Sequence, residues 1–139
     1  DLSEADLRNT NLSGANLSKT HLDEAKLSGA NLSRVDLSRT YLRAVKLNFA
    51  NLSGANLSGA KLSFANLSGA DVRANLTEAD LSWAFLRGSK LSFANLSGAD
   101  VRADLSGADL GKAKYNKYTK WPEGFDPKAA GAVLVGDDD

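Results

Sequence analysis

The 139-residue chain lacks several residue types on which small proteins build stability or chemistry. It contains no cysteine and no methionine, one histidine and two prolines. The absence of cysteine excludes a disulfide framework and a thiolate metal site, so we expect packing and hydrogen bonds alone to hold the fold.

The chain also lacks an excess of charge and any long apolar run. Lys and Arg number 17, and Asp and Glu number 17, for a formal net charge of zero. This balance argues against a strongly basic nucleic-acid binder and against a strongly acidic mimic of DNA. No apolar run reaches the roughly 18 residues of a membrane span, and no signal segment opens the chain. Because the first residue is Asp1, we expect a processed form or a domain of a longer protein.

In place of these features the chain has a period of five. Leu or a substitute recurs every five residues from Leu2 to Val72, and the series gives 24 central positions up to Tyr115. A small residue, usually Ala, lies two residues before each centre. A period of five matches neither the 3.6 of a helix nor the 2 of a strand. The chain must therefore turn once per repeat.

Four such units close one coil if each forms one side of a square. The central Leu and the small residue then point to the axis, and the polar residues face water. Stacked rungs lie about 4.7–4.9 Å apart, so six coils make a rod on the order of 30 Å long. A single unit buries almost nothing, and stability is expected to come from neighbouring coils.

The repeats "ANLSG", "ADLRN", "ANLSK" and "ADLSW" resemble the A-(D/N)-L-x-x motif of the pentapeptide-repeat family over about residues 1–115. The resemblance implies an all-β solenoid, a right-handed quadrilateral β-helix of about six coils, with the central Leu and the preceding Ala inside. The segment "KWPEGFDPKAAGA" also resembles tails of pentapeptide-repeat proteins from cyanobacteria and chloroplasts. Cytoplasmic and thylakoid-lumen or periplasmic locations both remain compatible with it.

Two repeats are one residue short. The sequence "KLSFANLSGADVRA" occurs at 61–74 and again at 90–103, and in each copy Ala74 or Ala103 ends one unit and begins the next. Because the later central residues stay in phase, we predict two tightened corners and no break. The first lies between the third and fourth sides, and the second between the first and second. A deletion at a corner costs little stability, so we interpret both deletions as tolerated changes. The alternative is that the shortened corner forms part of a functional site.

The ends of the rod need caps, because stacked rungs leave unpaired backbone there. We divide the chain into a β-helix at 1–115, a capping segment at 116–135 and a disordered acidic tail at 136–139. Asp126 and Pro127 predict a short helix that Gly131 ends. We expect no residue of this chain to cover the outer face of the first coil. Either an upstream segment that covered it has been removed, or a partner such as a second copy covers it end to end. The residues expected to form the C-terminal cap are Tyr118, Trp121, Phe125, Val133 and Leu134.

Motifs that suggest chemistry have simpler explanations in the repeat. The many Asn-Leu-Ser sequences match a glycosylation sequon, but the period generates them all, and we predict hydrogen-bonded ladders of Asn and Ser between rungs. His21, Asp23 and Glu24 are spread along one surface and do not converge with a further anchored ligand. We therefore expect them to be exposed polar residues and not a metal site. The serines are equivalent and have no neighbouring base. The sequence predicts no enzyme and no cofactor.

The sides of the coil differ in what they present to water. The third and fourth sides repeat Asn and Ser, whereas the first and second carry aromatic and basic residues. Large side chains facing water beside cations are typical of binding surfaces. Phe49 and Phe93 are interpreted as corner covers. The predicted partner surface comprises Tyr41, Arg43, Lys61, Phe64, Trp83, Phe85 and Arg87.

These observations favour a non-enzymatic structural or interaction module that presents a rigid rod to an unidentified protein partner. The family resemblance implies an alternative, a DNA-mimicking inhibitor of DNA gyrase. This chain departs from such inhibitors in its zero net charge, its interspersed Lys and Arg and its short tail. A second alternative, based on the tail, is the soluble domain of a cyanobacterial envelope or heterocyst-glycolipid-related membrane protein. Nucleic acid is not expected as a partner.

Overall fold

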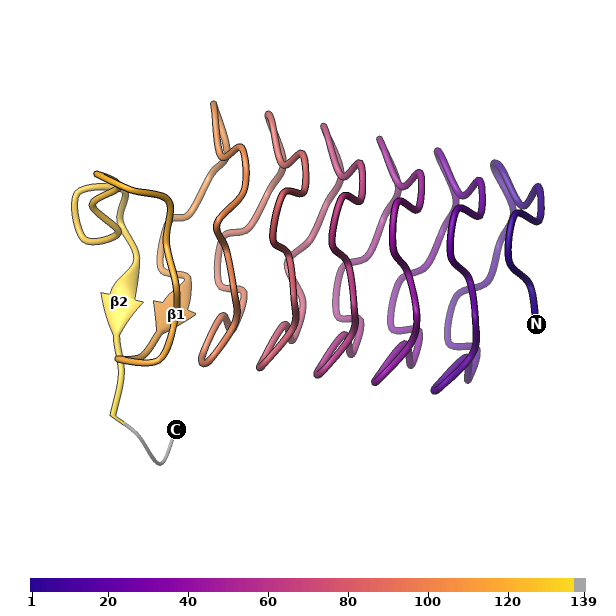
Figure 1. Ribbon diagram of the computed structural model, residues 1–139, viewed down its shortest axis with the longest axis horizontal. Helices are drawn as coiled ribbons and strands as arrows, with labels where there is room; N and C mark the ends of the chain where they lie inside the picture. The colour runs from indigo at the N-terminus through magenta and orange to yellow at the C-terminus, as the bar shows by residue number, and fades with distance from the viewer. Residues whose placement is uncertain (137–139) are drawn as a thin grey trace.

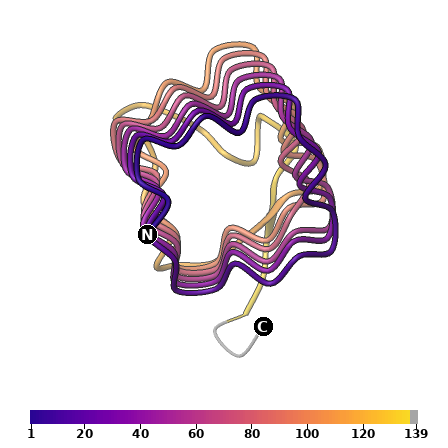
Figure 2. The ribbon, with the colours of Figure 1, turned by 90° about the vertical axis from the view of Figure 1, so that its right-hand side faces the viewer.

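The chain forms a rod of stacked coils, described here from a computed structural model over residues 1–136. The coils lie side by side along the long axis (Figure 1), and a view along that axis shows a four-sided outline (Figure 2). The described residues contain no helix that is long and apolar enough to cross a membrane. Of the tail expected at 136–139, residues 137–139 lie outside the described part of the chain.

Parallel β-bridges join each side of one coil to the same side of the next. Asp6 pairs with Lys26, Lys26 with Lys46 and Lys46 with Asn66. The N–H of Leu7 donates to the carbonyl of Lys26 at 2.8 Å, and the N–H of Lys26 donates back to Ala5 at 2.9 Å. The spacing of four repeats is the one expected if four units close a coil.

Longer strands do not form in most of the rod because a turn interrupts the chain every five residues. The central carbonyl accepts a hydrogen bond from the N–H three residues later, as from Ala5 to Leu2 at 3.1 Å. The residue two positions after the centre has a positive φ, +62° at Glu4 and +71° at Gly14. A positive φ at the third of four residues is characteristic of a type II turn, which explains the frequent Gly at this position.

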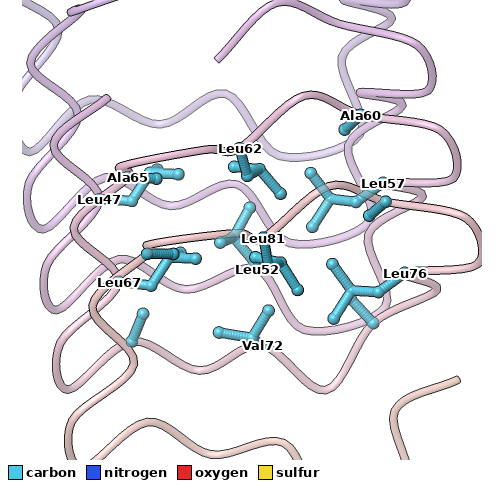
Figure 3. Packing of buried hydrophobic residues seen from close by; sticks show 14 of the residues in the cluster. Leu47, Leu52, Leu57, Ala60, Leu62, Ala65, Leu67, Val72, Leu76 and Leu81 are labelled. Atoms are coloured by element: carbon cyan, nitrogen blue, oxygen red, sulfur yellow. The ribbon is translucent and has the colours of Figure 1, made fainter. Parts of the chain in front are cut away.

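The central leucines and the small residues before them form one continuous core. Leu47, Leu52, Leu57 and Leu62 come from four different sides and point toward the axis (Figure 3), and all are fully buried. Full burial of a leucine contributes about 1.5–3 kcal/mol relative to exposure. Where Thr40 replaces the small residue, its hydroxyl donates to the carbonyl of Leu37 at 2.6 Å, so the buried oxygen is satisfied.

The two shortened repeats tighten corners without breaking the ladder. Bridges across the first one join residues nineteen apart, Asn56 with Asn75 and Lys61 with Asp80, and the spacing of twenty returns at Asn75 with Asn95. The prediction of tight corners in these places is therefore confirmed. The deletion removes the left-handed turn residue. At the second corner the N–H of Ala103 donates to the carbonyl of Val101 at 2.8 Å, a turn that spans three residues.

The C-terminal segment crosses the end of the last coil. Trp121 lies edge-on against Tyr115, with ring centroids 5.5 Å apart, and stacks on Phe125 at 5.2 Å. Strand β2 (Val133–Leu134) pairs in parallel with β1 (Lys114–Tyr115), and these are the two strands of the described residues.

Parts of this segment differ from the expectation. Tyr118 and the β2 residues Val133 and Leu134 are exposed, so Trp121 and Phe125 supply most of the aromatic cover. The expected short helix is instead a turn at 127–131, in which the N–H of Ala130 donates to Asp126 at 3.2 Å. The carboxylate of Asp126 does accept from two backbone N–H groups, as a helix cap would. Gly131, at φ +93°, turns the chain away after that.

The opposite end of the rod is bare within the described residues. Leu2 is exposed, and Leu7, Leu12 and Leu17 are half-buried, while the equivalent leucines of the second coil are fully buried. The difference arises because a first coil has a neighbour on one face only.

Candidate interaction surface

Two exposed aromatic residues occupy the left-handed turn position on the edge between the first and second sides. Phe64 has φ +62° and Trp83 has φ +61°, and their side chains are 52% and 71% exposed. A side chain in this backbone region costs roughly 1–2 kcal/mol relative to glycine. Phe49 and Phe93 hold the same conformation on other edges, so the strain is shared by several exposed aromatic residues of the chain.

These residues and Phe85, which follows Trp83 onto the second side, form what we call the aromatic edge. All three line one groove of about 690 Å³. The second tight corner contributes Arg102, Ala103 and Asp104 to the same groove, and the cap contributes Pro122 and Glu123.

The groove follows from the deletion. In the other coils along this edge, a turn residue such as Ala44, Phe64 or Trp83 lies two positions after the centre. The sixth coil lacks that residue, because Ala103 begins the next unit directly. A recess therefore lies between the turn at Trp83 and the cap at Pro122.

The charged groups of the groove are partly paired. The guanidinium of Arg102 donates to both carboxylate oxygens of Asp100, at 2.8 and 2.6 Å, which lowers the pKa of Asp100 and raises that of Arg102. Hydrogen bonds from Ser106 lower the pKa of Asp104, and the charge of Arg87 adds to the effect. Of the lining residues, Asp104 and Glu123 thus provide two carboxylates and Arg102 one cation that Asp100 already neutralises.

The remaining predicted surface residues lie farther toward the N-terminal end. Tyr41 stacks on His21 with ring centroids 4.4 Å apart, and the ammonium of Lys61 lies 4.6 Å from the centroid of the Tyr41 ring. Arg43 lines a smaller hollow together with Phe64. Six of the seven residues therefore form two groups, the aromatic edge and a set on the first side made of Tyr41, Arg43 and Lys61, and Phe64 lines both hollows. The seventh, Arg87, follows Leu86 on the second side, where its charge acts on Asp104.

Phe49 and Phe93 lie on other edges of the rod. A Cβ at Gly69 would come within 2.7 Å of the Phe49 ring, so this phenylalanine covers a glycine of the next coil. Phe93 has the ammonium of Lys112 5.6 Å from its ring centroid and lines a hollow beside the first tight corner at Ala74. Neither residue reaches the groove.

The polar repeats bond differently from the prediction at most positions, although the hydroxyl of Ser28 does donate to the amide oxygen of Asn48 in the next coil at 2.7 Å. The amide oxygen of Asn11 accepts from the N–H and hydroxyl of Ser13, at 3.1 and 2.7 Å, within its own unit. The same local pattern recurs at Asn31, Asn51 and Asn56. The predicted inter-rung ladders are wrong for these residues. The Asn side-chain oxygen lies closer to the N–H two residues later in its own turn than to a donor in the next coil.

The histidine and acidic residues of the second coil have structural contacts. His21 stacks on Tyr41, and a carboxylate oxygen of Asp23 accepts the N–H of Arg43 at 2.8 Å. Among residues 1–136, no three His, Cys, Asp or Glu side chains are placed to hold a metal ion together.

Sequence reasoning identified the aromatic edge but missed the rest of the groove. Arg102, Ala103, Asp104, Pro122 and Glu123 were not assigned to it, although the deletion beside Ala103 was visible and lay on the same edge. The missing signal is the path of the cap, which no repeat pattern specifies.

Comparisons with known proteins identify the family. A model of pentapeptide repeats, eight copies long, matches residues 1–39, 36–73 and 72–114. No curated protein matches the chain significantly.

Three solved structures are similar in sequence. The chain is 37% identical to alr5209 of Nostoc PCC 7120, covering 83% of this chain and 84% of that one, with a TM-score of 0.44. It is 30% identical to Rfr23 of the cyanobacterium Cyanothece 51142, covering 84% and 90%, with a TM-score of 0.46. It is 33% identical to HetL of Nostoc sp. strain PCC 7120, a protein involved in heterocyst differentiation regulation, covering 94% and 77%, with a TM-score of 0.32. The chain belongs to the pentapeptide-repeat family, and its fold is the right-handed quadrilateral β-helix of that family.

Proposed function

We propose that this chain is a non-enzymatic interaction module that binds a protein partner through the first and second sides of the rod. The observation that carries the proposal is the placement of Phe64 and Trp83. Phe49 and Phe93 occupy the same turn position on other edges, but Phe64 and Trp83 lie in one groove together with a third exposed ring, that of Phe85. Exposed aromatic rings that gather in one groove are typical of a binding surface.

The architecture supports this role. The core of buried leucines runs without interruption from Leu22 to Leu96, and each coil is bonded to the next on all four sides. A rigid scaffold holds its surface side chains in place before binding, which reduces the entropy lost when a partner docks.

The gyrase-inhibitor alternative has less support. A mimic of DNA must present closely spaced negative charge, since duplex DNA carries one charge per roughly 1.7 Å. Here the residues before the 24 centres include eight Asp, but eight Asn and five Lys lie among them, and Asp71 and Asp100 are paired with Arg73 and Arg102. Nothing in the described residues favours the alternative as the soluble domain of an envelope membrane protein.

The proposal is tested by affinity capture from a cyanobacterial lysate, with bound proteins identified by mass spectrometry. The wild type is compared with a triple variant carrying Phe64→Ser, Trp83→Ser and Phe85→Asn. The matched control is Phe93→Ser, which removes an equally exposed aromatic residue in the same turn position on another edge. Circular dichroism establishes that all three proteins are folded.

We expect one protein that the wild type and the control retain and the triple variant loses. Equal capture by all three would refute the proposal. Inhibition of supercoiling by purified gyrase would replace it with the alternative.

A further inference from the structure

The groove at the second tight corner has the dimensions of a binding site. Its volume of about 690 Å³ falls inside the range of roughly 300–1,000 Å³ that is usual for ligand sites. The first tight corner, at Ala74, lines a smaller hollow of about 370 Å³. The deletion at Ala103, which the aromatic edge and the cap flank, therefore lines a larger recess than the same deletion at Ala74.

The surface of the groove combines aromatic rings with carboxylates. Phe64, Trp83 and Phe85 supply the rings, and all three are about half exposed or more. A cation over the face of an aromatic ring is attracted by the ring quadrupole, and Trp is the best of the three for this contact. Trp83 is thus suited to receive a guanidinium or ammonium group.

The charges of the groove select the same ligand. Asp104 and Glu123 face the groove as carboxylates, the lining cation Arg102 is held by Asp100, and Arg87, which is near enough for its charge to act on Asp104, does not line the groove. Hydrogen bonds from Ser106 lower the pKa of Asp104, which keeps its carboxylate charged. An acidic ligand would meet two negative groups of the same sign, whereas a basic one would complement them.

We propose that this groove binds a basic segment of a partner protein, with an Arg or Lys side chain between Trp83 and the carboxylates of Asp104 and Glu123 and flanking apolar residues on Phe64 and Phe85. This inference rests on the proposed function and specifies its site and the chemistry of its partner. It assigns a role to the deletion beside Ala103, which makes room for the ligand.

The experiment uses three synthetic peptides that differ at one residue. They are acetyl-Ala-Leu-Arg-Leu-Ala-amide, the same peptide with citrulline as a neutral isostere of Arg, and the same peptide with Glu. Cellohexaose is added as a carbohydrate probe, because aromatic rings beside carboxylates also suit sugars. Binding to the full chain is followed by ¹H–¹⁵N chemical-shift changes at the Trp83 indole and the Ala103 amide.

Two insertions provide a matched pair of variants. A glycine inserted between Arg102 and Ala103 restores the five-residue repeat and the turn that the groove lacks. A glycine inserted between Arg73 and Ala74 does the same at the first tight corner and leaves the groove untouched. Both keep the later leucines inward, so both are expected to fold. Glu123→Gln removes one charge at the cap.

We expect the Arg peptide to bind at least tenfold more tightly than the citrulline peptide, and the Glu peptide not to bind. Glu123→Gln should weaken the Arg peptide about threefold to tenfold, a loss of roughly 0.7–1.4 kcal/mol. Insertion after Arg102 should abolish binding, and insertion after Arg73 should leave it unchanged.

The inference is overturned if Arg and citrulline peptides bind equally, if the insertion after Arg102 has no effect, or if cellohexaose alone binds. Absence of any shift at about 5 mM Arg peptide also overturns it, because that concentration exceeds the Kd of even a weak site near 1 mM. The capture experiment separates the two proposals. If the peptides fail while the triple variant still loses its partner, the interaction role stands and the basic ligand falls.

Discussion

The conformation of single residues explains why the repeats look as they do. In each full-length unit one residue adopts a positive φ, and the chain fills that position with Gly in some units and with Glu, Arg, Phe or Trp in others. The glycines avoid strain. Thirteen non-glycine residues adopt the same conformation, so the repeats tolerate this strain at many positions.

We expect Trp83→Gly to raise the free energy of unfolding by about 0.5–1 kcal/mol, because it relieves left-handed strain and loses little buried area. The converse control is Gly88→Ala, whose added Cβ meets no atom within 4 Å. It should lower that free energy by about 1–2 kcal/mol through backbone strain alone. Urea denaturation measures both, and a destabilised Trp83→Gly protein would show that the indole contributes to folding after all.

At the scale of the element, a unit is stable only between two neighbours. Leu52 in the third coil is fully buried, whereas Leu12, on the same side of the first coil, is half-buried. The side chains are chemically identical and have the same position in their repeats. Their different burial shows that stacking, and not the repeat itself, supplies the apolar environment.

Substitution of these two leucines should therefore have unequal effects. Leu52→Ala leaves a cavity with packed coils on both faces and should cost about 2–5 kcal/mol. Leu12→Ala opens onto solvent and should cost roughly half as much, since less area is lost from the core. Equal costs in urea denaturation would mean that another segment covers the first coil in solution.

Three local ion pairs recur along the described part of the rod. Arg73 and Arg102 each bind the Asp two residues earlier, and Arg8 binds Asp6 in the same way, which lowers the pKa of Asp6 to about 2. The pKa values of Asp71 and Asp100 are lowered for the same reason. Each of these three pairs therefore joins two residues of the same repeat.

These shifts predict a loss of stability in acid. An Asp whose pKa is lower in the folded state contributes stability above its unfolded value, about 3.9, and loses it as the pH falls through the folded value. The melting temperature should therefore decline between about pH 4 and pH 2. Asp100→Asn should flatten this decline, because one shifted carboxylate is gone. Identical pH profiles for the two proteins would contradict the role of the pair.

The sequence by itself determined the period, the four-sided coil, the buried leucines and the location of both tight corners. These features are local and repetitive: a centre such as Leu52 and the turn that follows it have the same surroundings in every inner coil. The repeat pattern is therefore enough to predict the conformation and burial of each unit. Family membership followed from the same pattern.

Only the tertiary structure decided which of the residues that depart from the repeat pattern come together. The groove joins Phe64, Trp83, Ala103 and Pro122, which come from three successive coils and the cap, and their contact depends on the path of a segment with no repeat. Asn side chains directly before a centre, such as Asn11, bond within their own turn, because a donor two residues away is closer than one a coil away. The cap formed a turn in place of a helix because Gly131 leads the chain back to pair with β1, a contact that local propensity does not encode.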